Sequence, residues 1–382
     1  MNIHQYRFSR HSHHFVSRDL EPSIWRRLHI DPWLVLMLLS VCLIGLTVLY
    51  SASTQDMAMV LRQTTSYGIA FAVMITMAQI PPNVYRTLTP IFYVLGLILL
   101  ILVELIGEVR MGAQRWIRIP GFGSVQPSEF MKLGMPMMCA WYLSKRELPP
   151  NLTTIITTLA IIAVPVLLIA KEPDLGTSIL VAASGMFVLF LSGLSWKIIG
   201  GAVAACIPFG YVMWNFLMLD YQKTRVITLF DPESDALSKG WNIIQSQTAI
   251  GSGGFTGKGY LEGTQSHLHF LPEGHTDFII AAFSEEFGLA GVLLLLFFYG
   301  CLLMRSFYIA IVTPDTYCRL LAGALTMSFF VYIFVNMGMV GGILPVVGVP
   351  LPLVSYGGTA IITLMASFGL LTCIHTHQNL KQ

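Results

Sequence analysis

The fold is decided by one stretch of the chain, Phe270-Leu271-Pro272-Glu273-Gly274-His275-Thr276-Asp277-Phe278-Ile279-Ile280. A long polar loop ends here and a deeply apolar run begins, so its polar side chains stand at the mouth of a region that excludes water. Thr276 is predicted to cap a helix with Asp277 in its first turn, because the periodic apolar residues start at Phe278 and continue past Leu293. The helix dipole favours a carboxylate there without any catalysis, so capping and chemistry are both open for Asp277.

The composition indicates an integral membrane protein. Apolar residues make up 55% of the chain and charged residues only 11%, against roughly 25% charged in soluble domains. The formal net charge is only +2, and no basic cluster interleaved with aromatics occurs, which argues against nucleic acid as a partner. The six cysteines stand singly in or beside apolar runs, so we expect buried thiols rather than disulfides or a zinc site.

Residues 1–30 are predicted to form a flexible cytoplasmic tail. The apolar run that follows, from Pro32 to Ser51, is too long for the core of a signal peptide and is preceded by several arginines. It is therefore predicted to be a retained anchor with its basic side in the cytoplasm. The tail also contains a cluster of His11, His13 and His14, for which a disordered segment is favoured over metal binding.

We expect an all-α polytopic membrane protein with about ten transmembrane helices, since about ten apolar runs approach the ~20 residues that cross a bilayer. No internal repeat is evident, so residues 31–382 are predicted to form one membrane domain. The fourth run is the most polar, because Glu129 and Lys132 lie in its first turns. The expected spans lie near 32–51, 64–80, 88–106, 127–144, 152–170, 175–194, 197–218, 277–304, 319–340 and 355–374.

Two loops are predicted to lie outside the cell membrane. An even number of spans returns the C-terminus to the cytoplasm, and basic residues in loop 107–126 then remain outside despite the positive-inside rule. Their retention suggests that they hold an anionic group. The large extracytoplasmic loop 219–276 separates the seventh and eighth helices. Within it, residues 251–259 fail as a phosphate-binding loop because Gly259 follows Lys258 where Ser or Thr is required, and they are predicted to be a flexible hinge.

Charged residues at membrane depth need a partner or a purpose. Glu129 and Lys132 share one face of the fourth span, where Gln126-Pro127-Ser128-Glu129 is also a good helix start with the glutamate reaching back to the cap. Lys132 lies a turn deeper and requires an anion, either Glu129 or a substrate phosphate. Glu285 and Glu286 are predicted to pair with Lys132 or to cap broken backbone near the last helix.

Three further features face the predicted outer side. Asp174 opens the sixth span, and helix capping is its structural explanation. Arg115 and Trp116 join a guanidinium to an aromatic ring, for which an aromatic belt is the default interpretation. The irregular connection 341–358 should be buried in protein or line a cavity, because bare backbone cannot face lipid. Carboxylates and cations around one outer cavity would suit an amphiphile with an anionic head.

These stretches resemble the SEDS family (shape, elongation, division and sporulation) of bacterial cell-wall membrane proteins, from about Asp31 to the C-terminus. Within the family, Gly263-Thr264-Gln265-Ser266 and the ending Ile374-His375-Thr376-His377 are similar to the elongation member rather than the division member. One departure is Glu172, which replaces an expected glutamine. The motifs that carry the resemblance are Gly112-Ala113-Gln114-Arg115-Trp116, Gln126-Pro127-Ser128-Glu129-Phe130-Met131-Lys132, Pro173-Asp174-Leu175-Gly176-Thr177, His275-Thr276-Asp277-Phe278 and Leu351-Pro352-Leu353-Val354-Ser355-Tyr356-Gly357-Gly358.

The resemblance implies a peptidoglycan glycosyltransferase of the bacterial inner membrane that polymerises lipid II by inverting transfer, with undecaprenyl pyrophosphate as leaving group. It implies a class B penicillin-binding protein and other elongation-complex membrane proteins as partners. Asp277 would be the catalytic general base. A divalent cation, Mg²⁺ or Mn²⁺, is left open because the sequence shows carboxylates without ligand spacing. By motif position the substrate-binding residues would be Glu129, Lys132, Arg115, Trp116 and Asp174.

Two other functions fit the same features. A lipid II flippase would also show a polar cavity among broken helices. A non-catalytic scaffold would only position a penicillin-binding protein. Polymer synthesis by the purified protein separates the enzyme from both alternatives.

Overall fold

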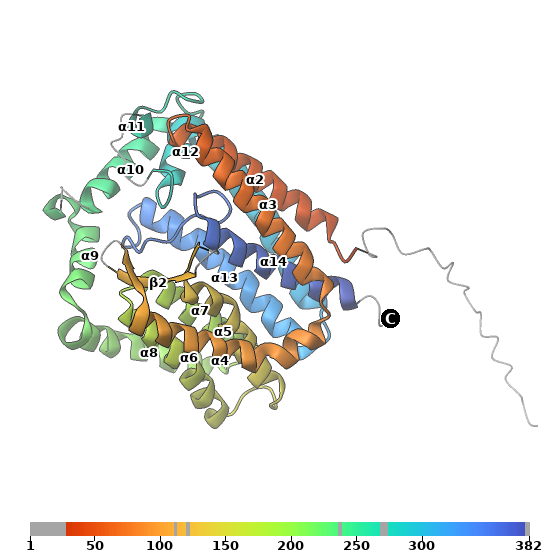
Figure 1. The fold of residues 1–382 in the computed structure, drawn as a ribbon. Helices are drawn as coiled ribbons and strands as arrows, with labels where there is room; N and C mark the ends of the chain where they lie inside the picture. The colour runs from red at the N-terminus through yellow and green to blue at the C-terminus, as the bar shows by residue number, and fades with distance from the viewer. Residues whose placement is uncertain (1–27, 111–112, 120–122, 236–238, 268–273, 379–382) are drawn as a thin grey trace, which may run out of the picture.

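The computed structural model describes residues 28–110, 113–119, 123–235, 239–267 and 274–378. It is a bundle of long helices with one small sheet on its surface (Figure 1). Most of the predicted tail, residues 1–27, lies outside the described residues. Apart from the small sheet, the described residues have the all-α architecture that the sequence predicts.

Ten helices correspond to the ten expected spans. Seven are long and apolar enough to cross a membrane by composition alone among the described residues. The other three are α7, which is short, and α3 and α5, which carry more polar side chains. The ten helices are α2 Pro32–Ala52, α3 Met57–Gln79, α4 Pro82–Ile106, α5 Pro127–Ser144, α6 Leu152–Lys171, α7 Leu175–Leu191, α8 Trp196–Val212, α12 Ile279–Val312, α13 Thr316–Val340 and α14 Gly358–Gln378.

Helix α13 lies at the centre of the bundle and packs against α5, α7, α12 and α14. Both described ends of the chain lie at one end of this bundle. The ring of His29 stacks on that of His377 with centroids 4.1 Å apart, and the side chain of Arg305 donates to Asp31 at 2.8 Å. Chain ends on one side agree with an even number of crossings.

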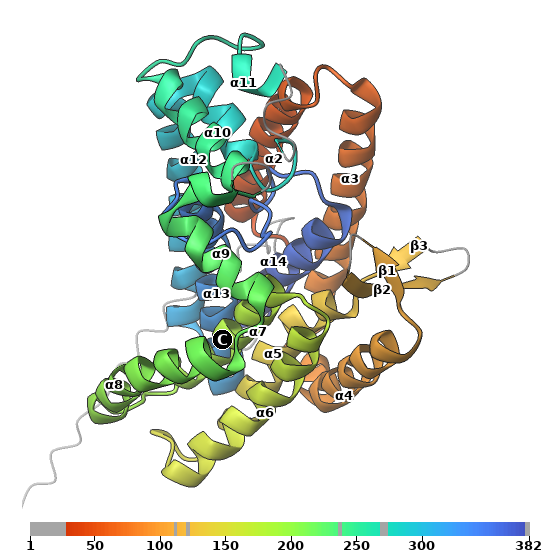
Figure 2. The same cartoon turned by 90° about the vertical axis from the view of Figure 1, so that its left-hand side faces the viewer.

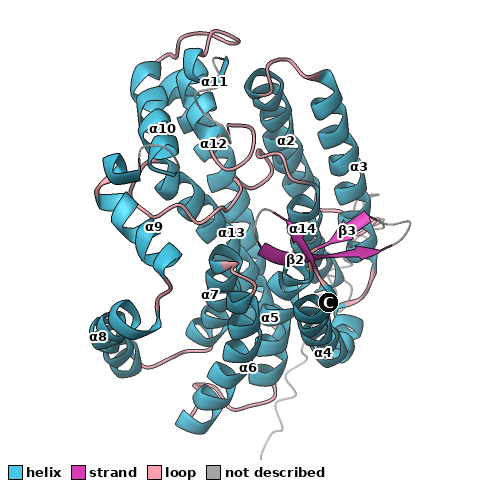
Figure 3. Cartoon of the chain, turned by 60° about the vertical axis from the view of Figure 1, so that its left-hand side comes forward, coloured by secondary structure: helices cyan, strands magenta, loops and turns pink. Residues whose placement is uncertain are grey.

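Helix α8 stands apart from the bundle, as Figures 2 and 3 show. None of its residues is buried, so its apolar side chains face outward along its whole length. A five-residue π-helical segment, Met213–Leu217, continues it. Composition predicted this span, but composition does not report which helices a span packs against.

A small antiparallel sheet was not predicted by the sequence analysis. The expected loop 107–126 contains β1 Glu108–Arg110, β2 Ala113–Ile119 and β3 Gly123–Val125 in the order β1-β2-β3. Glu108 lies opposite Trp116, and Ile117 opposite Val125. The side chain of Gln114 donates to the carbonyl of Val103 at 3.0 Å, which fixes the sheet to the end of α4.

The large loop between α8 and α12 is mainly helical. It contains α9 Asp220–Phe230, a 3₁₀ turn Pro232–Asp235, α10 Lys239–Gly253 and α11 Thr264–His267. Helix α10 packs against α12.

The backbone of the glycine-rich segment 251–259 is hydrogen-bonded to α12, so its interpretation as a flexible hinge is wrong. Helix α12 breaks at Gly288, which has a φ of 63°. The backbone groups that lose their helical partners at this break form hydrogen bonds with segment 251–259. Leu289 N donates to Gly254 O at 3.0 Å, and Lys258 N donates to Glu285 O at 3.0 Å. The Lys258 ammonium also lies 2.6 Å from the Glu285 carboxylate, so Lys258, rather than the predicted Lys132, is the partner of Glu285.

Gly257→Ala is expected to destabilise this junction by about 2 kcal/mol or more, the range for a Cβ forced into an incompatible site. Gly257 has a φ of 81°, and a Cβ there would lie 2.0 Å from the carbonyl oxygen of Glu286. The measurement is thermal unfolding of the purified protein in detergent. Gly251→Ala is the matched control, because a Cβ at Gly251 meets nothing within 4 Å. Equal unfolding temperatures for the two variants would contradict the docked geometry.

Candidate functional site

A buried ion pair forms the centre of the candidate site. Lys132 Nζ lies 2.5 Å from Glu129 Oε1, and the two side chains are only 13% and 8% exposed. Thr363 of α14 donates to the other carboxylate oxygen at 2.8 Å. The predicted shared face of α5 is confirmed. The capping interpretation of Glu129 is wrong, because Gln126 caps the helix without a side-chain bond and the glutamate side chain is directed to Lys132 and Thr363.

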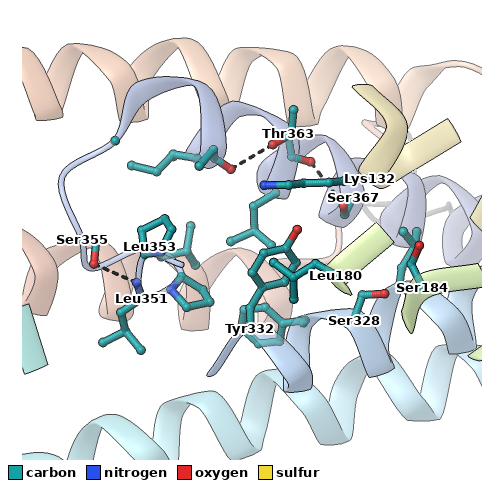
Figure 4. A pocket seen from close by; sticks show the side chains of 18 residues that line it. Lys132, Leu180, Ser184, Ser328, Tyr332, Leu351, Leu353, Ser355, Thr363 and Ser367 are labelled. Atoms are coloured by element: carbon teal, nitrogen blue, oxygen red, sulfur yellow. Dashed lines mark hydrogen bonds between the residues drawn. The ribbon is translucent and has the colours of Figure 1, made fainter. Parts of the chain in front are cut away.

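Lys132 lines a narrow cavity between α5, α7, α13 and α14 (Figure 4). Its Nζ lies 5.3 Å from the ring centroid of Tyr332, within reach of a cation–π interaction. The cavity holds about 50 Å³, which is room for a few waters. A sugar or pyrophosphate would therefore need it to widen. Its polar wall consists of Lys132, Ser184, Ser328, Tyr332, Ser355, Thr363 and Ser367.

The predicted cavity-lining role of the connection between α13 and α14 is confirmed. Residues 350–353, Ser355 and Gly357 form part of the wall, and residues 351–355 are buried. Leu351 N donates to Ser355 Oγ at 2.8 Å, so a side chain satisfies backbone that forms no helix here.

Asp174 caps α7, as the sequence predicts, and it also joins neighbouring elements. Its Oδ1 accepts from Thr177 N at 3.2 Å, while its Oδ2 accepts from the side chain of Gln126 at 2.9 Å. Because Gln126 stands at the start of α5, this bond ties the beginning of α7 to the helix that carries Lys132. Asp174 is 6% exposed.

Arg115 fixes the small sheet to the turn between α6 and α7. Its Nε donates to the carbonyl of Glu172 at 3.1 Å, its Nη2 donates to the carbonyl of Pro173, and its Nη1 lies 3.8 Å from Asp174. Much of its donor capacity is thus used within the protein. Trp116 follows in β2 and is half-buried. Substrate binding by Arg115 and Trp116 stays a prediction.

Glu172 is a buried carboxyl at this turn. It is 4% exposed, and neither carboxyl oxygen has a hydrogen-bond partner among the described residues. Burial raises the pKa of Glu172 from 4.5 to about 8, and the nearby charge of Asp174 adds to the shift while that of Arg115 opposes it. A protonated glutamate is neutral, like the glutamine that the family resemblance leads us to expect at this position.

Glu172→Gln is expected to flatten the pH dependence of stability. Because the folded-state pKa of Glu172 lies above its ordinary value of 4.5, the folded state binds the extra proton and the free energy of unfolding falls as pH rises from about 4.5 through 8. The variant should gain on the order of 1–3 kcal/mol over wild type at pH 9 and little at pH 5. Thermal unfolding from pH 5 to 9 checks this, with Glu147→Gln, an exposed carboxylate, as control. Parallel curves for wild type and Glu172→Gln would contradict it.

Asp277 lies in a turn directly before α12. The helix begins at Ile279 with Phe278 at its N-cap, so the predicted cap at Thr276 is wrong and Asp277 precedes the first turn. Asp277 is half-buried. Its Oδ2 lies 3.5 Å from the position of a Cβ built on Gly348, so the carboxylate packs beside a residue without a side chain.

One residue connects Asp277 to the cavity of Lys132. Ser355 lines that cavity and donates to the carbonyl of Thr276 at 2.6 Å. The structure thus brings Glu129, Lys132, Asp174 and Arg115 together, and places the Asp277 turn against the wall of the same cavity.

The site residues predicted from the sequence do not include the polar residues of α13 and α14 that line the cavity. Ser328 and Tyr332, like Thr363 and Ser367, stand four apart within apolar helices, and this spacing places each pair on one helix face. The four-residue spacing of these polar side chains could have identified them from the sequence. No group of three or more His, Cys, Asp or Glu side chains that could hold a metal ion occurs among the described residues, and the divalent cation stays a prediction.

The fold and site define a polytopic α-helical membrane protein with a buried ion pair beside a carboxylate-bearing turn. Residues 32–380 match the model of a family described as "Cell cycle protein", named for FtsW, RodA and SpoVE. The chain belongs to this family, which is the SEDS family that its motifs indicate.

The relatives and solved structures that are similar to this protein match almost the whole chain. Peptidoglycan glycosyltransferase MrdB of Escherichia coli K12 is 51% identical over 358 residues, covering 94% of this chain and 96% of that protein. A solved structure described as "Structural coordination of polymerization and crosslinking by a peptidoglycan synthase complex" aligns with a TM-score of 0.80 at 28% identity, covering 91% of this chain and 98% of that one. The rod shape determining protein RodA of Thermus thermophilus aligns with a TM-score of 0.68 at 26% identity, covering 90% and 96%.

Proposed function

We propose that this protein is a peptidoglycan glycosyltransferase that polymerises lipid II into glycan strands for cell elongation. The observation that carries the proposal is the 51% identity to peptidoglycan glycosyltransferase MrdB over 94% of the chain. The site is consistent with it, because the buried ammonium of Lys132 lines a polar cavity and the turn that carries Asp277 is hydrogen-bonded to Ser355 in the wall of that cavity.

Asp277 acts as the general base in this proposal. It removes the proton from the 4-hydroxyl of a GlcNAc as that oxygen attacks the anomeric carbon of a MurNAc. The bond between the anomeric carbon and the pyrophosphate oxygen breaks, and undecaprenyl pyrophosphate leaves with the electron pair. A single displacement inverts the anomeric configuration.

Lys132 stabilises the departing pyrophosphate. An ammonium in a site that excludes water stabilises developing negative charge far better than one in solution. Glu129 holds that ammonium at the cavity wall, and Thr363 donates to the other oxygen of the Glu129 carboxylate. Asp174 orders the start of α5 through Gln126, and Arg115 with Trp116 contacts the substrate at the sheet.

The proposed setting is the bacterial inner membrane, with both termini in the cytoplasm and the sheet and α9–α11 outside. A class B penicillin-binding protein is the proposed partner, together with other elongation-complex membrane proteins. The support is the similarity to a chain of a peptidoglycan synthase complex whose description joins polymerisation to crosslinking.

The test is polymer synthesis in vitro. Purified protein is incubated with a class B penicillin-binding protein whose transpeptidase is inactivated and with lipid II, and products are resolved by length on a gel. Glycan ladders are expected, and reactions with a chelator, Mg²⁺ or Mn²⁺ determine the cation requirement. Transfer of labelled lipid II across liposomes without polymer would support the flippase, and neither activity would support the scaffold; both outcomes would reject the proposal.

A further inference from the structure

Three consecutive backbone carbonyls at the Asp277 turn are each held by a hydrogen bond. His275 O accepts from Tyr356 N at 3.0 Å, Thr276 O accepts from Ser355 Oγ at 2.6 Å, and Asp277 O accepts from Asn336 Nδ2 at 2.8 Å. All three donors belong to α13 or to the connection that follows it. The backbone of the turn is thereby fixed through three of its carbonyl oxygens.

Asn336 joins two separate loops. It is fully buried in α13, and its amide nitrogen also donates to Val349 O at 2.7 Å. Because both contacts are carbonyl oxygens, only the nitrogen end of the amide can face them, and this fixes the side-chain orientation. A buried amide in an apolar helix is costly unless it is bonded. These two bonds satisfy the amide nitrogen, while the amide oxygen is buried without a hydrogen-bond partner among the described residues.

Ser355 links the wall of the cavity to the turn that carries Asp277. Its hydroxyl accepts from Leu351 N at 2.8 Å while it donates to Thr276 O. Ser355 is 2% exposed, so both bonds are shielded from water. A shift of the cavity wall therefore moves the residue that precedes Asp277.

We propose that Asn336 and Ser355 are positioning residues, which hold the Asp277 carboxylate at the sugar hydroxyl that it deprotonates. This inference rests on the proposed function. Each of them acts on the backbone of the turn. A misplacement of about 1 Å at a reacting group costs roughly 100-fold in rate, so loss of either donor should lower kcat more than it alters KM.

The experiment measures polymerisation kinetics and backbone protection in four variants. Asn336→Leu keeps similar shape without donors, and Ser355→Ala removes the hydroxyl. Both should lower kcat about 10- to 100-fold with KM for lipid II within about threefold of wild type. Ser355→Thr restores a hydroxyl and should recover most of kcat. Thr326→Val is the matched control, because Thr326 is buried in the same helix and its hydroxyl bonds only Ala322 O among the described contacts.

Hydrogen–deuterium exchange supplies a readout independent of activity. Amides of residues 274–281 and of Tyr356 should exchange at least tenfold faster in Asn336→Leu and Ser355→Ala, with α4 and α6 unchanged. Unchanged exchange at the turn, a uniform rise over all helices, or kcat within twofold of wild type would each overturn the inference. Wild-type protein that makes no polymer would instead reject the proposed function, while the exchange result would still decide whether these residues hold the turn.

Discussion

Asp277→Asn should lower polymer synthesis by about 10²- to 10⁴-fold, the contribution typical of a positioned general base. Asparagine has the same shape as aspartate but cannot accept the proton of a sugar hydroxyl. The turn should survive the change, because the carbonyls of Thr276 and Asp277 stay bonded to Ser355 and Asn336. The measurement is the initial rate of glycan formation from lipid II at equal amounts of folded protein.

Asp220→Asn is the control for this experiment. Asp220 is an exposed carboxylate in the same large loop, in the first turn of α9, and its variant should retain wild-type activity. An Asp277→Asn protein that keeps more than about a third of wild-type activity would remove Asp277 from the chemistry and leave another group to act as base.

Lys132→Met should lower both stability and activity. Breaking a buried ion pair by removing one partner typically costs about 3–5 kcal/mol, because the remaining charge stays buried. Here the remaining charge is Glu129, left with Thr363 as its donor. Activity should fall about 100-fold or more, the loss typical when a group that stabilises developing charge is removed.

A double variant separates the two effects. In Lys132→Met/Glu129→Gln no unpaired charge remains, so thermal stability should return to near that of wild type while polymerisation stays low. Recovery of both would show that the ion pair only supports the fold. Lys171→Met is the control, since Lys171 and Glu104 are 66% and 47% exposed and such pairs contribute about 0–1 kcal/mol.

The sequence predicts the helical spans and some contacts within single helices of the candidate site, because both are local patterns. Apolar runs report membrane-crossing helices whatever they pack against. The spacing of Glu129 and Lys132 places them on one helix face, and the structure confirms their pairing. The capping role of Asp174 is likewise readable from the residues that follow it.

Contacts between distant segments were not predictable in the same way. Thr363 bonds Glu129 across 234 residues, and nothing in either local sequence indicates the other. The partner of Glu285 was predicted wrongly for the same reason, since Lys258 reaches it only because a glycine segment docks at the break in α12. The small sheet could not be predicted in this way, because its strands contain only three to seven residues. Strands this short show only a weak alternation of apolar and polar side chains.

The stacking of His29 on His377 has a consequence for the connectivity of the molecule. Because residues 29 and 377 lie side by side, a short linker could join those two positions. New termini opened between α5 and α6 would then leave each helix with its present neighbours. A circular permutant of that kind should insert and fold, which would show that the order of synthesis of the helices does not determine their final arrangement.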